Sequence, residues 1–193
     1  MNPDFFKTLI KSLRPLHTKT DALALGCSHT WGVGVESHEA WPHLLNAMNF
    51  GIAGCSANLV VRMGKEVLKN NPQVTKVYVL WPDWTRFEYE KDGTIHQSLA
   101  TDPDRLKLMF RYTDLELKKN FNQQTEDLKL FCQDRNIRLI GISLYDLIPY
   151  LDHSSRWPLS NLGHHYAPSW HQQVAKIFQN AEINNIEHPL AYD

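Results

Sequence analysis

Apolar residues fall into two alternating patterns along this chain, short continuous runs and longer amphipathic stretches. The runs are bounded by turn-forming residues and lack polar alternation, which predicts short buried strands at 22–25, 76–81 and 138–142. Residues 49–54 are predicted as a further short strand followed by a glycine turn. The stretches place apolar residues at helical spacing, which predicts helices over 40–48, 58–70, 102–136 and 168–180. The third of these is either one long helix or two with a break near 120–124. Segments 82–93 and 154–167 are predicted as loops, and 143–151 is ambiguous.

Strand and helix alternate from one end of the chain to the other. Such alternation predicts an α/β fold, with three α/β/α layers and a doubly wound, mostly parallel sheet. The 193 residues suit a single domain with a sizeable core. Residues 1–20 are expected to add an N-terminal amphipathic helix packed on that domain.

Charge and cysteine content narrow the possible partners. The formal net charge is −1, so neither nucleic acid nor an anionic membrane is favoured as a partner, and a small neutral or weakly charged ligand fits better. The three cysteines are odd in number and lack metal-site or redox-site spacing. No apolar run approaches the roughly 20 residues of a membrane span. We therefore expect a cytoplasmic protein without a disulfide scaffold, and the oligomeric state is left open.

A serine lies in a small-residue turn directly after the first predicted strand. Ser28 is flanked by Gly26, Gly32 and Gly34, which allow close backbone approach. In α/β proteins, ligands collect at the carboxyl ends of parallel strands, so Ser28 is a candidate nucleophile. The ordinary alternative is that Ser28 caps the following helix. As a nucleophile it would need a base and oxyanion donors from elsewhere in the chain.

Residues 26–32, GCSHTWG, resemble the first block of the SGNH, or GDSL, hydrolases, G-D-S-x-T-x-G. Four of the five fixed positions match, and Cys27 replaces the aspartate. Near the C-terminus, GHHY at 163–166, followed by Pro168, His171 and Ala175, resembles the last block of that family. This resemblance implies a hydrolase with Ser28 as nucleophile and His165 as general base. It leaves Leu162 where the family has the aspartate that orients the histidine.

The middle blocks of the family are less complete here. The resemblance puts Gly54 at the second-block glycine, whose N–H joins that of Ser28 in the oxyanion hole, with Asn58 as a nearby amide. The third-block asparagine is absent from the loop after 76–81. Thr85, Arg86 or a backbone N–H could replace that donor. A backbone carbonyl could hold His165, or a carboxylate from Asp83 or Asp152 could orient it.

Aromatic residues are dense in the loops expected around Ser28. Faces of this kind suit sugar rings or acyl groups, although loop aromatics also anchor loops to the core. The candidate substrate-binding residues are Trp31, Trp81, Trp84, Arg86 and Tyr166. Arg86 is expected either to bind a substrate anion or to pair with Glu88 or Glu90.

Together these features predict a serine esterase for a small ester, such as an O-acetylated carbohydrate, with no cofactor and no metal. One alternative is a catalytically impaired member of the fold that binds a carbohydrate or a protein partner. Another is a hydrolase with a metal held by histidines, although no metal-ligand spacing supports it. Those histidines are His29, His164, His165 and His171. His171 is expected to be structural, and Cys27 to be a buried residue rather than a nucleophile.

Overall fold

Four parallel strands form the central sheet, in the order β2-β1-β3-β6. The computed structural model describes residues 20–91, 93–97, 112–147 and 166–184. The strands are β1 (Ala22–Gly26), β2 (Met48–Gly51), β3 (Lys76–Trp81) and β6 (Arg138–Ser143). In register, Ala24 lies beside Asn49 on one side and Tyr78 on the other. The predicted strands and the predicted α/β class are confirmed, whereas the N-terminal helix expected within 1–20 lies almost wholly outside the described residues.

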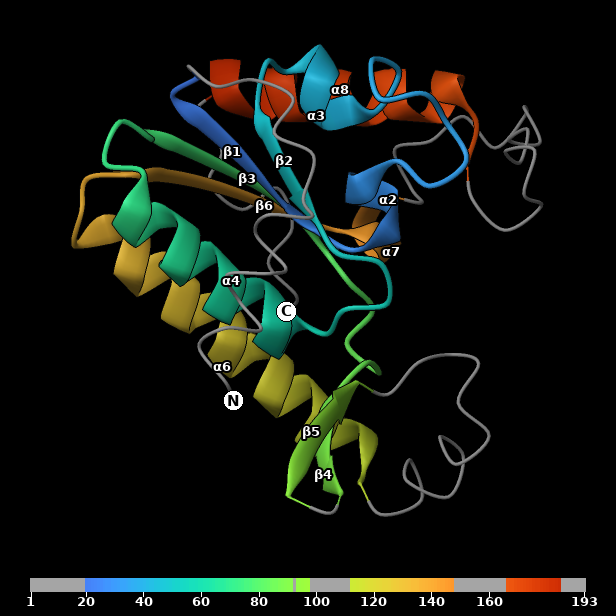
Figure 1. Cartoon of the computed structure of the whole chain (residues 1–193), viewed down its shortest axis with the longest axis vertical. Coiled ribbons are helices and arrows are strands. Elements are labelled where there is room, and N and C mark those ends of the chain that lie inside the picture. Colours follow the sequence, from blue (N-terminus) through green and yellow to red (C-terminus); the bar gives the residue numbers. More distant parts are fainter. Residues whose placement is uncertain (1–19, 92, 98–111, 148–165, 185–193) are drawn as a thin grey trace.

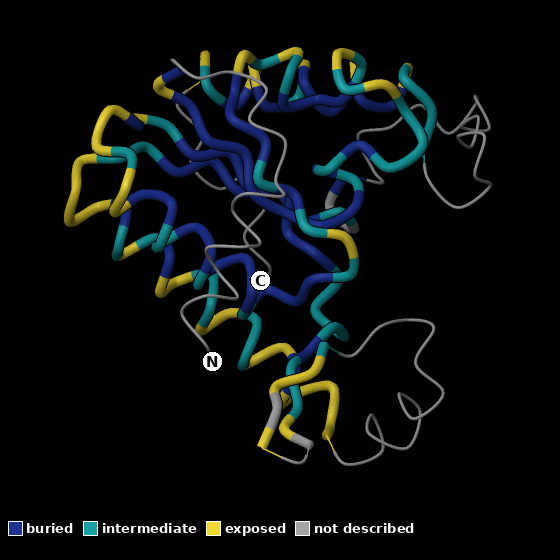
Figure 2. Tube along the Cα trace, in the orientation of Figure 1, coloured by how far each residue is buried: buried dark blue, intermediate teal, exposed yellow. Residues whose placement is uncertain are grey.

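Helices cover both faces of this sheet (Figure 1). Helices α4 (Ala57–Asn70) and α6 (Asp114–Gln133) lie against one face, and α3 (Trp41–Leu44) and α8 (Pro168–Ile183) against the other. Strand side chains alternate between the two faces, so Leu23 and Leu25 belong to one apolar cluster and Ala22 and Ala24 to the other. Figure 2 shows the strands buried along almost their whole length. A continuous apolar run is therefore the expected sequence of such strands.

Helix α4 follows the predicted pattern closely. Its inward-facing residues are buried, as the 58–70 pattern requires: Leu59, Val60, Met63, Val67 and Leu68. Ser56 caps the helix by accepting a hydrogen bond from the backbone N–H of Leu59 at 3.3 Å.

Helix α6 begins later than the pattern over 102–136 suggested. Thr113 and Glu116 form a reciprocal capping box, which starts the helix at Asp114. The helix then runs without interruption to Gln133, so the break considered near 120–124 was wrong. Residues 102–111 lie outside the described part of the chain.

The helix predicted over 40–48 was too long. Helix α3 has four residues, and Asn46 then takes a left-handed backbone conformation at φ 51°, which ends the helical course. Met48 already pairs with Leu23 as the first residue of β2. Buried apolar residues at helical spacing can belong to a helix, a turn and a strand in succession, and periodicity alone does not separate them.

The predicted loop over 82–93 contains a strand of an unexpected hairpin. Strands β4 (Glu88–Lys91) and β5 (Thr94–Gln97) pair in antiparallel fashion, with Gly93 at φ 72° in the turn. The hairpin lies away from the main sheet, beside the start of α6 (Figure 1). The Asp92-Gly93 dipeptide is a known signal for such a two-residue turn.

Two short helices complete the described part. Helix α2 (Ser28–Trp31) follows β1, and α7 (Leu144–Leu147) follows β6 within the segment that was ambiguous in sequence. The predicted loop over 154–167 lies mostly outside the described residues. Helix α8 begins at Pro168, as predicted, and extends to Ile183. Across the described ranges, no helix combines the length and the apolar character needed to cross a membrane.

Candidate active site at the carboxyl edge of the sheet

The four parallel strands end at one edge of the sheet, and the predicted site segments follow directly from three of them. Ser28 follows β1, Gly54 follows β2, and Thr85 and Arg86 follow β3. Parallel strands share the edge at which their carboxyl ends emerge. The fold therefore gathers at one edge segments that lie up to 58 residues apart in the sequence.

Ser28 is the first residue of α2, and Cys27 occupies the N-cap position. No side chain caps this helix, so Ser28 is not the N-cap considered as the ordinary alternative. Its carbonyl oxygen accepts hydrogen bonds from the N–H groups of Gly32 (3.0 Å) and Val33 (3.1 Å). The Ser28 residue is buried, with 7% of its surface exposed. As a first-turn residue, its N–H has no partner within the helix.

Two glycines let the turn that carries Ser28 lie directly on the strand ends. A Cβ atom on Gly26, at φ 150°, would lie 2.2 Å from Oγ1 of Thr30 and 2.5 Å from the carbonyl oxygen of Leu80. A Cβ atom on Gly51 would lie 2.1 Å from the backbone nitrogen of Trp31. All three distances are far below van der Waals contact, so only glycine fits at either position.

Asn49, on β2, fastens the far end of α2. Its buried side-chain nitrogen donates to the carbonyl oxygens of Thr30 (2.9 Å) and Trp31 (3.3 Å). Its side-chain oxygen accepts a hydrogen bond from the N–H of Gly51 at 2.9 Å. Sequence reasoning missed this residue, although a polar side chain in a buried apolar run was a signal that it serves a specific partner.

The turn that carries Gly54 is hydrogen-bonded to Gly26, the residue before Cys27. The carbonyl oxygen of Gly26 accepts hydrogen bonds from the N–H of Ile52 at 2.8 Å and from Sγ of Cys55 at 3.4 Å. Gly54 itself has φ 74° within that turn. The second predicted block therefore lies against the first.

The two cysteines here are buried and belong to the core. Cys27 is 1% exposed and Cys55 is fully buried, which confirms the interpretation of Cys27 as a buried residue. Burial raises the pKa of the Cys55 thiol, the nearby Cys27 raises it further, and the Arg86 guanidinium opposes this. Because the thiol form is favoured, Cys55 is a poor candidate for a nucleophile.

The loop after β3 is ordered by Asp83. Its Oδ1 atom accepts a hydrogen bond from the N–H of Thr85 at 2.8 Å, and its carbonyl oxygen accepts one from the N–H of Arg86 at 2.9 Å. The Nη1 atom of Arg86 is enclosed by protein, and no hydrogen-bond acceptor among the described residues reaches it.

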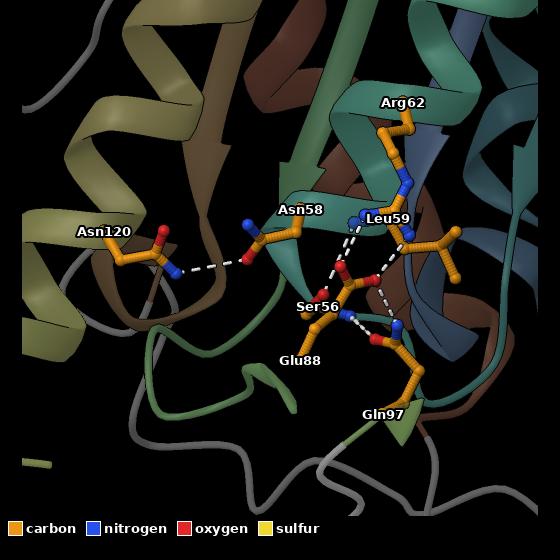
Figure 3. Close-up of polar contacts among 7 residues, drawn as sticks. All are labelled: Ser56, Asn58, Leu59, Arg62, Glu88, Gln97 and Asn120. Carbon is orange, nitrogen blue, oxygen red and sulfur yellow. Dashed lines mark hydrogen bonds and ion pairs between the residues drawn. The ribbon is translucent and has the colours of Figure 1, made fainter. Parts of the chain in front are cut away.

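Glu88 is engaged by another arginine. Arg62 of α4 holds its carboxylate with both terminal nitrogens, the Nη2–Oε1 contact being 2.6 Å, and Nε2 of Gln97 also donates to it (Figure 3). Gln97 in turn accepts a hydrogen bond from the N–H of Ser56 at 2.9 Å. Of the partners considered for Arg86, Glu88 is therefore paired with Arg62 instead. The network attaches the β4–β5 hairpin to the start of α4.

Asn58 takes part in a helix–helix contact. Its side-chain oxygen accepts a hydrogen bond from Nδ2 of Asn120 on α6 at 3.1 Å. Figure 3 shows the Asn58 side chain turned towards Asn120 and away from Glu88. We assign Asn58 to the α4–α6 interface.

The candidate substrate-binding aromatics have different surroundings. Trp81 is 4% exposed in the core, with its ring edge-on to Phe121, so we assign it to packing. Trp31 is half-buried against the same apolar cluster. The ring of Trp84 faces Nζ of Lys118, 5.0 Å from the ring centroid.

Tyr166 lies next to the residue that follows Ser28. Its ring stacks on Trp170 with 4.7 Å between centroids, and its centroid is 5.1 Å from that of the His29 imidazole. His165 itself lies outside the described residues, as do Leu162, His164 and Asp152. The roles assigned to them stay predictions.

His171 is structural, as expected. It is 1% exposed on α8, and its Nδ1 atom accepts a hydrogen bond from the backbone N–H of Trp41 at 3.3 Å. Within the described ranges, no group of three or more His, Cys, Asp or Glu side chains is arranged to hold a metal ion.

A cavity of about 390 Å³ lies at the opposite edge of the sheet. Its lining includes Val74 and Ile137, which precede β3 and β6, together with Leu68 at the end of α4. It is therefore separate from the strand ends that carry Ser28.

Comparison of the chain with protein-family models gives no match, and comparison with curated protein sequences gives none either.

Proposed function

We propose that this protein is a serine esterase of the SGNH/GDSL hydrolase type that acts on a small ester, with O-acetylated carbohydrates as the first class to test. In this proposal the sheet with helices on both faces is a three-layer, doubly wound α/β/α frame, in which β1 lies between β2 and β3. The three free, buried cysteines are compatible with a reducing cytoplasmic location, which we also propose.

The observation that carries the proposal is the contact between Tyr166 and His29. These residues are the immediate sequence neighbours of His165 and Ser28, and their ring centroids are 5.1 Å apart. His29 and Tyr166, which are more than 130 residues apart in the sequence, thus lie against each other beside Ser28.

In the proposed reaction, Oγ of Ser28 attacks the ester carbonyl while His165 accepts the hydroxyl proton. The N–H groups of Ser28 and Gly54 donate to the oxyanion of the tetrahedral intermediate. His165 then gives the proton to the departing alcohol, leaving an acyl group on Ser28. Water, activated by His165, attacks that acyl group, releases the acid and restores the serine. Neither a metal nor a cofactor is part of this sequence.

Labelling with a fluorophosphonate probe tests the nucleophile directly. We expect covalent modification of the wild-type protein and none of Ser28→Ala. Ser169→Ala is the matched control, because Ser169 is an exposed serine at the start of α8. Labelling that persists in Ser28→Ala, or that Ser169→Ala abolishes, would contradict the assignment.

Turnover of 4-nitrophenyl acetate separates the remaining outcomes. Ser28-dependent hydrolysis supports the esterase. Hydrolysis without probe labelling that a chelator abolishes would instead favour the metal-dependent alternative. A folded protein that shows neither labelling nor turnover would favour the impaired, ligand-binding alternative.

A further inference from the structure

Arg86 carries a positive charge that no described acceptor satisfies. Its side chain is half-buried, and its Nη1 atom is enclosed by protein without a hydrogen-bond acceptor among the described residues. Enclosed charged groups in proteins normally meet an opposite charge or several acceptors, because removing them from water is costly. The residue as a whole is partly exposed to solvent.

The acidic side chains nearest to Arg86 in the sequence have other partners. Glu88 is held by Arg62 and Gln97, and Oδ1 of Asp83 accepts the N–H of Thr85. Burial raises the pKa of the Cys55 thiol, so this group does not supply a counter-charge to Arg86. Within the described part of the chain, no carboxylate forms an ion pair with Arg86.

Arg86 follows β3, the strand that lies beside the one preceding the candidate nucleophile. Gly26, two residues before Ser28, pairs with Leu80 of β3, and Sγ of Cys55 donates to the carbonyl oxygen of the same Gly26. The backbone of Arg86 is held in place by Asp83, at the same edge of the sheet. The loop that carries Arg86 and the turn that carries Ser28 therefore leave neighbouring strands at the same edge of the sheet.

We propose that Arg86 binds a negatively charged group of the substrate, so that the preferred ester is one that carries a carboxylate or a phosphate-type group near the scissile bond. The planar guanidinium presents paired donors that match two oxygens of either anion. This inference rests on the proposed esterase function for its substrate class. It goes beyond that function by naming the anion as the group recognised.

Paired substrates test the preference. The neutral ester is 4-nitrophenyl valerate, and the charged ones are mono-4-nitrophenyl glutarate and 4-nitrophenyl 3-phosphonopropionate. We expect wild-type kcat/KM to favour one or both charged esters by about 10- to 100-fold, in line with hydrogen bonds to charged groups. Which charged ester is favoured identifies the anion. Equal kcat/KM values for all three esters in the wild type would overturn the inference.

Variants assign the preference to Arg86. We expect Arg86→Gln to lose it and Arg86→Lys to keep part of it. Arg135→Gln, which removes an exposed arginine from the opposite edge of the sheet, is expected to keep it fully. A preference that survives in Arg86→Gln would overturn the inference. Thermal unfolding checks that each variant is folded. If Arg86→Gln does not fold, the preference measured in Arg86→Lys decides whether Arg86 is responsible.

Binding measurements distinguish failure of this inference from failure of the esterase proposal. Glutarate and 3-phosphonopropionate are titrated into wild type, Ser28→Ala and Arg86→Lys by calorimetry. Arg86-dependent binding in a protein that hydrolyses no ester would retain the anion site and reject the esterase. Ser28-dependent hydrolysis of the neutral ester, with neither anion bound, would retain the esterase and reject the anion site.

Discussion

Asn49 donates its side-chain amide to the carbonyl oxygen of Thr30 at 2.9 Å, joining the middle of β2 to the helix that begins with Ser28. The same amide nitrogen reaches the carbonyl oxygen of Trp31. A four-residue helix has little stability of its own, because helix nucleation is unfavourable. The orientation of Ser28 therefore depends on a side chain from the neighbouring strand.

Replacing Asn49 by alanine is expected to destabilise the protein by about 2 kcal/mol, since it leaves buried backbone groups without partners. We also expect esterase activity to fall. Urea unfolding and 4-nitrophenyl acetate turnover measure the two effects. Asn70→Ala is the matched control, because its amide also donates to a helical carbonyl, that of Glu66, but at an exposed position. Equal losses for the two variants would contradict this role of Asn49.

The Arg62–Glu88 ion pair is expected to hold the β4–β5 hairpin in place. Glu88 is the more buried partner, with 11% of its side chain exposed against 34% for Arg62. In a double-mutant cycle with Arg62→Met and Glu88→Gln, we expect a coupling of about 1 kcal/mol. Hydrogen exchange of the hairpin amides should accelerate in either variant.

The exposed Lys69–Glu66 pair provides the control cycle for that measurement. It joins residues of a single helix, so its coupling is expected to be near zero. A hairpin that exchanges at the wild-type rate in Glu88→Gln would show that other contacts hold it.

Glu182 is expected to make stability depend on pH in the acidic range. The Tyr78 hydroxyl donates to its carboxylate at 2.7 Å and Nζ of Lys76 at 3.0 Å. The hydrogen bond from Tyr78 lowers the pKa of Glu182 below its usual 4.5. The hydrogen bond from Lys76 and the positive charge of Lys76 lower it further. Below pH 4.5 the unfolded chain then binds a proton that the folded chain does not, so stability falls as pH falls.

The measurement compares wild type with Glu182→Gln by urea unfolding between pH 7 and pH 3. The stabilising contribution of the carboxylate is fully present above pH 4.5 and is lost as pH falls through the lowered pKa of the folded state. We therefore expect the two stability curves to converge at low pH. Curves that stay parallel over the whole range would exclude this contribution.

Tyr166→Ala is expected to lower kcat by about 10-fold, because small displacements of a catalytic group are costly. The ring of Tyr166 contacts His29 and Trp170, and its loss would loosen the chain next to His165. Steady-state hydrolysis of 4-nitrophenyl acetate measures the effect, with circular dichroism to check the fold. Tyr112→Ala, at an exposed tyrosine that contacts Phe87, is expected to keep the wild-type kcat. A wild-type kcat in Tyr166→Ala would remove the support that this contact lends to His165.

The sequence by itself determined the central strands and the faces of α4 and α8. A strand such as β3 is buried on both faces of the sheet, so its continuous apolar run is enough to identify it in the sequence. The amphipathic spacing of α4 likewise marks the face that meets the sheet. The position of Ser28 in the turn after β1 follows from the same local pattern.

Tertiary structure decided which side chains pair with each other and where helices and strands begin and end. Met48 belongs to β2 because Leu23 lies beside it, and Glu88 pairs with Arg62 rather than Arg86 because the hairpin folds back onto α4. Long-range contacts of this kind have no periodic signature in the chain. These contacts depend on which elements lie next to each other after the sheet has formed, so they are known only from the folded structure.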